Sequence, residues 1–379
     1  MDRKLNYELV RTTAQRAGYS FTKLAREVAV STESVSKWMN GETNPRPGKA
    51  IKLGKALGLS YEQMFGARDR ALEPQVAFRL VRNQNPSEEH RERARELGRM
   101  YEDLVPFLPF NRFEAPPRLK SPTAEYDYLD ELASSLRREM GLEADVPVSL
   151  PSIFNHLSDK LQAVVIPVFW GHRKNKAELA AHIYSRKTKT TWIPFNLDAK
   201  LWDARFWAAH ELAHVYTFDV LDDESSEVFS DAFAGTLVFP VSIAKAAYED
   251  LQKARLKSQR LSVLVEYAKR MHVSPICVAK QVDRFAVAKK LPSVNAEYEG
   301  LYPAVSMMSK REKTVAGEFF GDGEPSVSQL CEATANIFKS PFFDTLSKYL
   351  KASGGSPSFI QGLLDCSLVD AKALNSELA

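Results

Sequence analysis

The sequence predicts a multidomain α+β protein, with an all-α N-terminal domain, a central α+β domain and a mainly helical C-terminal region. Its 379 residues suggest two or three domains, because one domain usually holds roughly 100–200 residues. Short helical patterns bounded by Gly and Pro fill residues 6–65, and β-rich runs occur at 163–170 and 190–196. Helical patterns dominate the remainder of the chain.

Positive charge is concentrated near the N-terminus. The chain holds 51 Lys and Arg against 48 Asp and Glu, a formal net charge of +3, which is too balanced for a nucleic-acid-binding surface over the whole molecule. Residues 1–70 hold 13 basic and 7 acidic residues, a net charge of +6, so the remaining residues carry −3. An appended nucleic-acid-binding module has this distribution.

The cysteines and the absence of apolar segments predict the compartment. Cys277, Cys331 and Cys366 lie far apart without a CxxC pair, which excludes a disulfide scaffold and a Cys-based zinc finger and fits a reducing environment. The N-terminus lacks the apolar core of a signal peptide, and no run approaches 18 apolar residues. We therefore expect a cytoplasmic protein with no membrane partner.

The sharpest motif is His210-Glu211-Leu-Ala-His214. Positions i and i+4 share one face of a helix, so both imidazoles can bind one Zn²⁺ ion, while Glu211 can take a proton from a water beside it. Glu227 and Asp231 repeat this spacing downstream. We predict that Glu227 is the third zinc ligand, and that Asp231 accepts the free N–H of a ligating His.

Less specific interpretations remain open for these residues. A bare HExxH pattern also occurs in ordinary amphipathic helices, and the apolar flanks and the second spaced pair favour the metal site here. Should Glu227 not bind zinc, Glu224 or Asp231 would be the next candidate. His182 is a weaker candidate for stabilising an oxyanion, and a structural role is favoured for it.

Two segments around these motifs resemble the ImmA/IrrE metallopeptidases. They are Arg205-Phe-Trp-Ala-Ala-His-Glu-Leu-Ala-His214 and the segment 227–240, which ends Gly-Thr-Leu-Val-Phe-Pro. The chain departs from the family pattern at Ala213, where Gly is usual, at Ser230, where Ala is usual, and at Asp231, where Asn is usual. Flanking helical segments extend the resemblance to roughly 125–289. It implies a zincin-like (gluzincin) α+β domain with zinc endopeptidase activity.

Residues 7–65 resemble an Xre-type, phage-repressor-like helix-turn-helix, with the match lying in 21–45. Leu24, Val28 and Val35 would hold two helices at a tight turn. The second helix would then present its first residues to base edges, namely Ser31, Thr32, Ser34 and Lys37, with Glu33 among them. Phosphate contacts are expected from Lys23, Arg26, Arg46 and Lys49. The resemblance implies binding to double-stranded DNA and favours a homodimer.

These motifs predict four segments. They are a helix-turn-helix domain at 1–70, a helical connector and linker at 71–124, an ImmA/IrrE-like zinc metallopeptidase domain at 125–289 and a helical region of unknown role at 290–379. The resemblance implies that a repressor protein, or the chain itself, is cleaved in phage, mobile-element or stress control. The alternative is a transcriptional regulator whose zincin-like domain senses a ligand or partner and cuts little. An interaction scaffold would require the metal site to be empty.

Overall fold

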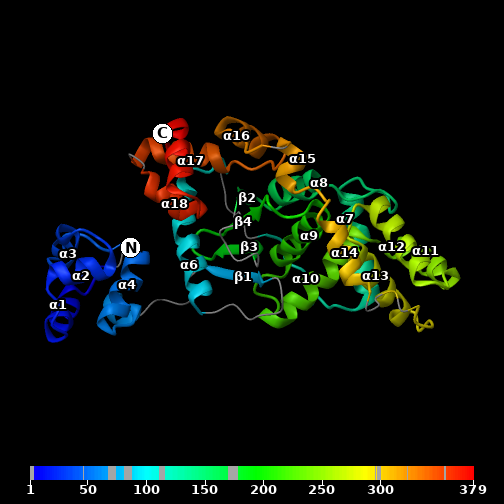
Figure 1. Cartoon of the computed structure of the whole chain (residues 1–379), viewed down its shortest axis with the longest axis horizontal. Coiled ribbons are helices and arrows are strands. Elements are labelled where there is room, and N and C mark those ends of the chain that lie inside the picture. Colours follow the sequence, from blue (N-terminus) through cyan, green and yellow to red (C-terminus); the bar gives the residue numbers. More distant parts are fainter. Residues whose placement is uncertain are drawn as a thin grey trace. The chain divides into compact units, whose positions relative to one another are not determined.

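The computed structural model divides the chain into two compact units, Met1–Glu73 and Pro74–Ala379 (Figure 1). Each unit is described by itself. The structure describes residues 4–45, 47–66, 74–80, 88–110, 116–169, 178–294, 296, 300–321, 323–353 and 356–379. The prediction of a multidomain α+β protein is confirmed. The finer boundaries that we place at 124/125 and 289/290 stay predictions.

The N-terminal unit is helical, as predicted. Its helices are α1 (Tyr7–Arg16), α2 (Phe21–Val28), α3 (Thr32–Met39), α4 (Pro47–Leu57) and α5 (Tyr61–Phe65). Ala29 takes a left-handed conformation with φ 56°, which makes the turn between α2 and α3 tight enough for the two helices to pack. Leu24, Val28 and Val35 are fully buried between them, and the unit has a hydrophobic core of its own.

A four-stranded mixed sheet lies in the second unit. Its strands are β1 (Gln75–Leu80), β2 (Ala163–Val168), β3 (Glu178–Ser185) and β4 (Thr190–Asn196), in the order β1-β3-β4-β2. β3 pairs antiparallel with both β1 and β4, whereas β2 pairs parallel with β4. Every residue of β2 and β4 is buried, which explains why both read as continuous apolar runs. The other two strands were not predicted.

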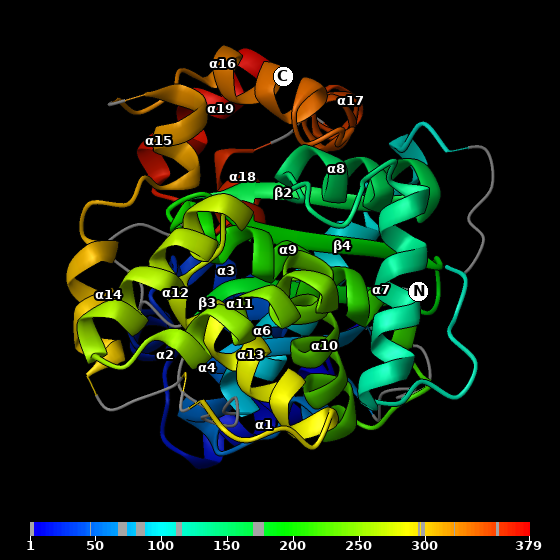
Figure 2. The ribbon, with the colours of Figure 1, turned by 90° about the vertical axis from the view of Figure 1, so that its right-hand side faces the viewer.

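Helices cover both faces of this sheet (Figure 2). α9 (Leu201–Thr217) packs on β3 and β4, while α6 (Glu88–Glu102) packs on β1 and β3. His182 of β3 contacts α9 and its neighbour Ile183 contacts α6, so the two helices lie on opposite faces. α8 (Leu150–Asn155) and α10 (Asp223–Val238) pack directly on α9. The other helices before the C-terminal region are η2 (Val105–Phe107), α7 (Tyr126–Glu139), η3 (His156–Lys160), α11 (Val241–Lys253), α12 (Lys257–Met271) and α13 (Pro275–Ala288).

The C-terminal region is helical and shares the core of the second unit. Its helices are α14 (Leu301–Ser309), α15 (Val315–Phe320), α16 (Val327–Asn336), α17 (Phe342–Ser353), α18 (Pro357–Leu364) and α19 (Leu368–Leu378). Leu301, Phe338 and Phe342 are fully buried in the same hydrophobic cluster as α9 and the sheet. Within the described residues, no single helix is long and apolar enough to cross a membrane, and only the pair α10 and α11, bent by 77°, passes such a test together.

Candidate metal centre

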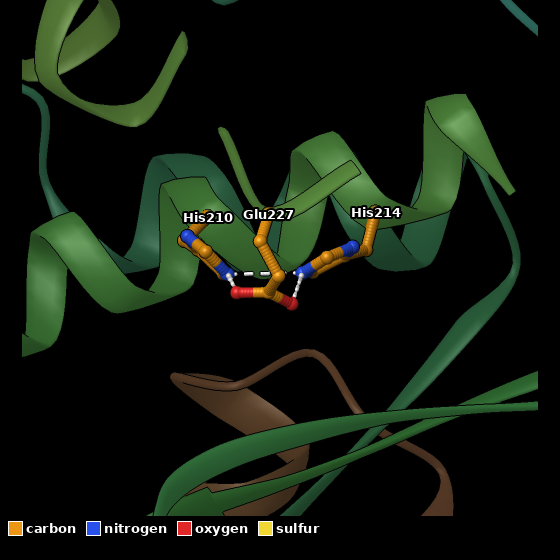
Figure 3. Close-up of side chains that lie close together, drawn as sticks. All are labelled: His210, His214 and Glu227. Carbon is orange, nitrogen blue, oxygen red and sulfur yellow. Dashed lines mark hydrogen bonds and ion pairs between the residues drawn. The ribbon is translucent and has the colours of Figure 1, made fainter. Parts of the chain in front are cut away.

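The first part of the site lies on α9, where two imidazoles share one helix face (Figure 3). His210 and His214 are 0% and 4% exposed, and their ring centroids lie 4.6 Å apart. Residues 208–215 of α9 are all buried, because the helix is wedged between the sheet and α10. Such burial is costly for two imidazoles unless their nitrogens find partners.

The second part of the site comes from α10, which packs antiparallel against α9. Asp222 caps this helix by accepting a hydrogen bond of 2.8 Å from the Ser225 N–H. One turn later, the half-buried Glu227 points between the two imidazoles (Figure 3). Its Oε1 lies 3.1 Å from His214 Nε2, and its Oε2 lies 3.5 Å from His210 Nε2.

These atoms have the spacing that a tetrahedral zinc site needs. The two Nε2 atoms are 2.9 Å apart, so the three ligand–ligand distances run from 2.9 to 3.5 Å. Tetrahedral bonds of about 2.0–2.1 Å place two ligand atoms about 3.3 Å apart. His210, His214 and Glu227 can therefore hold one metal ion, as the sequence predicts.

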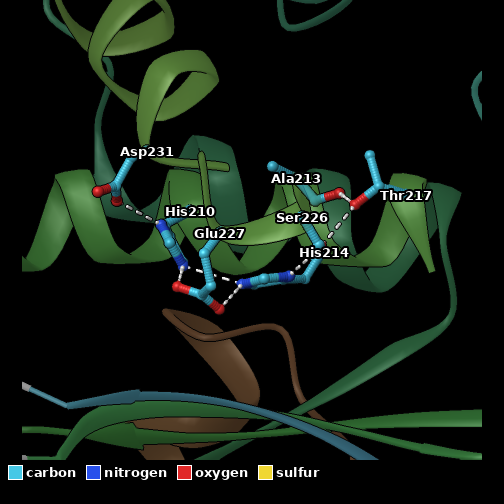
Figure 4. Close-up of polar contacts among 7 residues, drawn as sticks. All are labelled: His210, Ala213, His214, Thr217, Ser226, Glu227 and Asp231. Atoms are coloured by element: carbon cyan, nitrogen blue, oxygen red, sulfur yellow. Dashed lines mark hydrogen bonds and ion pairs between the residues drawn. The ribbon is translucent and has the colours of Figure 1, made fainter. Parts of the chain in front are cut away.

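A second layer of residues holds each imidazole by its other nitrogen (Figure 4). Asp231 Oδ1 lies 3.0 Å from His210 Nδ1, at the position predicted for it. Ser226 Oγ lies 3.1 Å from His214 Nδ1, and Thr217 Oγ1 lies 3.4 Å from the same Ser226 oxygen. Partners on Nδ1 leave both Nε2 atoms directed at the metal position. Sequence reasoning missed Ser226, whose only signal is its place directly before Glu227.

The electrostatics of Glu227 favour its ionised form. Burial alone would raise the pKa of the carboxyl, but hydrogen bonds from His210 and His214 and the charges on both rings outweigh burial and hold the pKa well below its usual range. An anionic carboxylate beside two imidazole nitrogens is a donor set that zinc accepts. Glu211, the predicted proton acceptor, is 2% exposed and follows His210 on the same helix.

The structure also brings His182 to this centre, from β3. Its ring lies nearly parallel to that of His214, with the centroids 6.2 Å apart, and it contacts the Phe218 ring at 5.7 Å. Burial, with a smaller contribution from His214, lowers the pKa of His182 to about 3, so the imidazole is neutral. Neither ring nitrogen has a hydrogen-bond partner among the described residues, which is rare for a buried imidazole.

A cavity of about 360 Å³ lies beside the N-terminal end of α9. Leu201, Trp202 and Arg205 of α9 line it, together with Met308 and Glu312 from the C-terminal region. None of the metal-centre side chains lines this cavity. The cavity therefore lies between α9 and the C-terminal region, and its lining is separate from the metal-centre side chains.

Of the predicted DNA-contacting residues, Ser31, Thr32 and Ser34 lie at the start of α3 and Lys37 lies in its last turn. Ser31, Thr32 and Lys37 are exposed, and Ser34 is half-buried. Ser31 caps α3 by accepting a 3.1 Å hydrogen bond from the Ser34 N–H, and Lys37 pairs with Glu33 at 2.8 Å. Lys23 and Arg26 are exposed on α2, while Lys49 donates to the carbonyls of Val28 and Ala29. Arg46 lies outside the described residues.

Comparison with known proteins identifies the N-terminal unit. The helix-turn-helix family model matches residues 11–63, so this unit is a helix-turn-helix domain, a class that binds DNA. No ImmA/IrrE family model matches the chain, and no curated protein matches it.

Two solved structures show only a distant likeness. A Mycobacterium tuberculosis transcriptional regulator is 15% identical with a TM-score of 0.29, and the match covers 49% of this chain and 50% of that one, about half the length of that regulator. ComR from Streptococcus suis is 12% identical with a TM-score of 0.17, covering 100% of this chain and 94% of that one. At these TM-scores neither likeness bears on the fold or function of the chain.

Proposed function

We propose that the chain is a transcriptional regulator in which a helix-turn-helix domain is joined to a zinc endopeptidase. The observation that carries the proposal is the triad of His210, His214 and Glu227, whose ligand–ligand distances of 2.9–3.5 Å fit tetrahedral zinc. The resemblance of residues 205–214 and 227–240 to ImmA/IrrE metallopeptidases supports the same reading. A repressor protein, or the chain itself, is the proposed substrate.

Each residue of the centre then has a distinct task. His210, His214 and Glu227 would hold a zinc ion, and the ion would supply Lewis acidity toward a water molecule and the substrate carbonyl. Glu211 would accept a proton from the attacking water and return it to the leaving amine. Asp231 and Ser226 fix the orientation of His210 and His214 through their Nδ1 atoms.

Metal analysis of the purified chain tests this proposal. We expect about one zinc per chain, lost in His210→Ala, His214→Ala and Glu227→Ala. His272→Asn is the matched control, because His272 is exposed, and Asn tolerates its left-handed conformation with φ 55°. Full zinc content in Glu227→Ala would refute the third ligand and direct attention to Glu224.

Hydrolysis requires a separate measurement. Glu211→Gln should keep the zinc and lose cleavage of candidate repressors, because glutamine cannot accept the proton. A zinc-loaded wild-type chain that cuts neither candidate repressors nor itself, while Glu211→Gln behaves identically, would contradict the peptidase.

A ligand sensor is the second candidate, and the cavity of about 360 Å³ favours it. This volume is within the range of small-molecule pockets, and its walls join α9 to the C-terminal region. In a sensor, metal removal or ligand binding would change DNA affinity without any cleavage. DNA binding measured with and without a chelator separates the two candidates.

A further inference from the structure

β3 is the strand nearest to the metal ligands. It carries His182, whose ring stacks on His214, and α9 packs on it more extensively than on β4. One edge of β3 is paired with β4, inside the sheet. An extended chain that paired with the other edge of β3 would run beside the metal centre.

That edge is occupied by β1, which comes from a distant part of the sequence. β2, β3 and β4 all lie within residues 163–196, whereas β1 spans Gln75–Leu80, at the beginning of the second unit (Figure 1). The pairing is antiparallel, and the residue opposite His182 is Ala77. The middle of β1 therefore runs alongside the point of β3 that is closest to the metal ligands.

β1 is the partner of β3 that lies at the edge of the sheet. Among the described residues, β1 pairs with β3 alone, so its outer edge carries no ladder in that part of the sheet. The register is also irregular between Phe78 and Leu80, and a bulge interrupts ladder hydrogen bonds. β4, by contrast, pairs along both edges. Local opening costs the least free energy where few ladder hydrogen bonds hold the backbone, so an edge strand with an interrupted ladder opens more readily than the central β4.

We propose that the outer edge of β3 is the surface that binds an extended segment of the protein substrate, and that β1 occupies this surface in the resting chain. Extended peptides bind proteins by adding a strand to a sheet edge, where main-chain hydrogen bonds supply affinity. The incoming segment pairs antiparallel with β3 in place of β1 and so passes beside His182. The identification of the bound segment as a substrate rests on the proposed peptidase function. The exchange of β1 for that segment does not itself require hydrolysis.

Gly98 of α6 offers a way to loosen β1 without changing its sequence. A Cβ atom at this position would lie 2.6 Å from Pro74 Cβ and 3.0 Å from Ile183 Cγ2, so the α6 backbone closes directly on the residue that precedes β1. Gly98→Ala must therefore push Pro74 away. Gly362→Ala on α18 is the matched control, because its nearest atom is the flexible end of Met100 at 3.1 Å.

Peptide binding to the full zinc-loaded chain tests the proposal, with Glu211→Gln included to prevent cleavage. The probe is a fluorescent peptide with the β1 sequence, Pro-Gln-Val-Ala-Phe-Arg-Leu, and fluorescence anisotropy gives its affinity. We expect Gly98→Ala to bind it about tenfold more tightly than the parent chain, since the competing strand is weakened. Gly362→Ala should bind like the parent. Equal affinity in all three proteins would overturn the proposal.

Amide hydrogen exchange on the parent chain keeps the test independent of any folding defect in Gly98→Ala. The amides of β1 should exchange faster than those of β4, and excess peptide should protect β3 while exposing β1. A peptide with Pro in place of both its Val and its central Ala should have no effect, because one of two adjacent N–H groups must face β3 and Pro cannot donate to the ladder. If the amides of β1 were as protected from hydrogen exchange as those of β4, β1 would be a fixed strand, and its replacement by the peptide would be refuted. In the zinc-loaded chain with Glu211 intact, peptide binding without any cleavage would instead contradict the peptidase and leave the edge site standing.

Discussion

Replacing His182 by Phe should make the second unit less sensitive to acid. Burial, followed by the charge of His214, lowers the pKa of His182 to about 3 in the folded chain, whereas an unfolded His titrates near 6.5. The unfolded chain therefore binds a proton below about pH 6.5 that the folded chain rejects. The stability contributed by the neutral ring is complete above that pH and is lost as the pH falls toward 3.

The size of the effect follows from these values. A pH of about 5 lies about 1.5 units below the pKa of the unfolded imidazole, whereas the folded imidazole is still neutral at that pH. The folded state therefore loses about 2 kcal/mol of stability relative to neutral pH. The ring is 1% exposed, so solvent screening reduces this figure little. At about pH 7.5, His182→Phe should be at least as stable as the parent, because both imidazole nitrogens lack partners in the described structure.

Guanidinium denaturation at the two pH values measures this difference. A chelator removes metal from both proteins, and tryptophan fluorescence follows the second unit, which holds four of the five tryptophans. The parent should lose about 2 kcal/mol more than His182→Phe on acidification. Other histidines titrate in both proteins and cancel in the comparison. An identical pH dependence in the two proteins would refute the buried, neutral His182.

Further expectations concern the metal, the DNA and the C-terminal region. Asp231→Asn should keep one zinc per chain but weaken its affinity about 10–100-fold in chelator competition, because the Asp fixes the His210 ring; unchanged affinity would remove Asp231 from the site. Lys37→Ala should weaken a specific DNA site by about 1–3 kcal/mol in anisotropy titrations, and an equal loss on random DNA would make Lys37 a phosphate contact. Ala316→Pro deletes the N–H that donates to the Leu197 carbonyl at 2.9 Å and should speed amide exchange in the first turn of α9, with Ala316→Ser as the control.

The metal triad was predictable because local geometry determines most of it. The i and i+4 spacing of His210 and His214 places both rings on one face of any helix, and Glu227 lies on the next helix after a short return. Ser226 was not predictable in the same way, because serines are common on helix surfaces. The residue that Ser226 contacts depends on how α10 is rotated about its axis relative to α9. The approach of Ser226 Oγ to His214 Nδ1, 3.1 Å, is a property of packing.

The sheet was predictable only where burial made the strands apolar. β2 and β4 have every residue buried, and both were predicted. β3 contains two alanines, a histidine and a serine, and β1 lies in a segment that we interpreted as a helical connector. β1 depends on pairing with β3 across about a hundred residues of sequence, which no local pattern encodes, whereas β3 forms a hairpin with β4 but lacks the β-rich composition that marks its partner. His182 could be placed at the metal centre only after this pairing was known.

The C-terminal region is part of the framework of α9. The Val315 N–H donates to Ala199 O and the Leu201 N–H donates to Lys313 O, both at 2.9 Å, so this region pairs with the backbone on both sides of residue 200, where α9 begins. Lys200 also donates to the Glu312 carbonyl at 2.7 Å. α14, α16 and α17 bury side chains in the hydrophobic cluster that surrounds α9. Removing residues 290–379 would therefore expose part of this core at the same time as it removed any regulatory element. Point changes at the backbone contacts of 312–316 therefore separate a regulatory role of this region from its structural one, which a truncation cannot do.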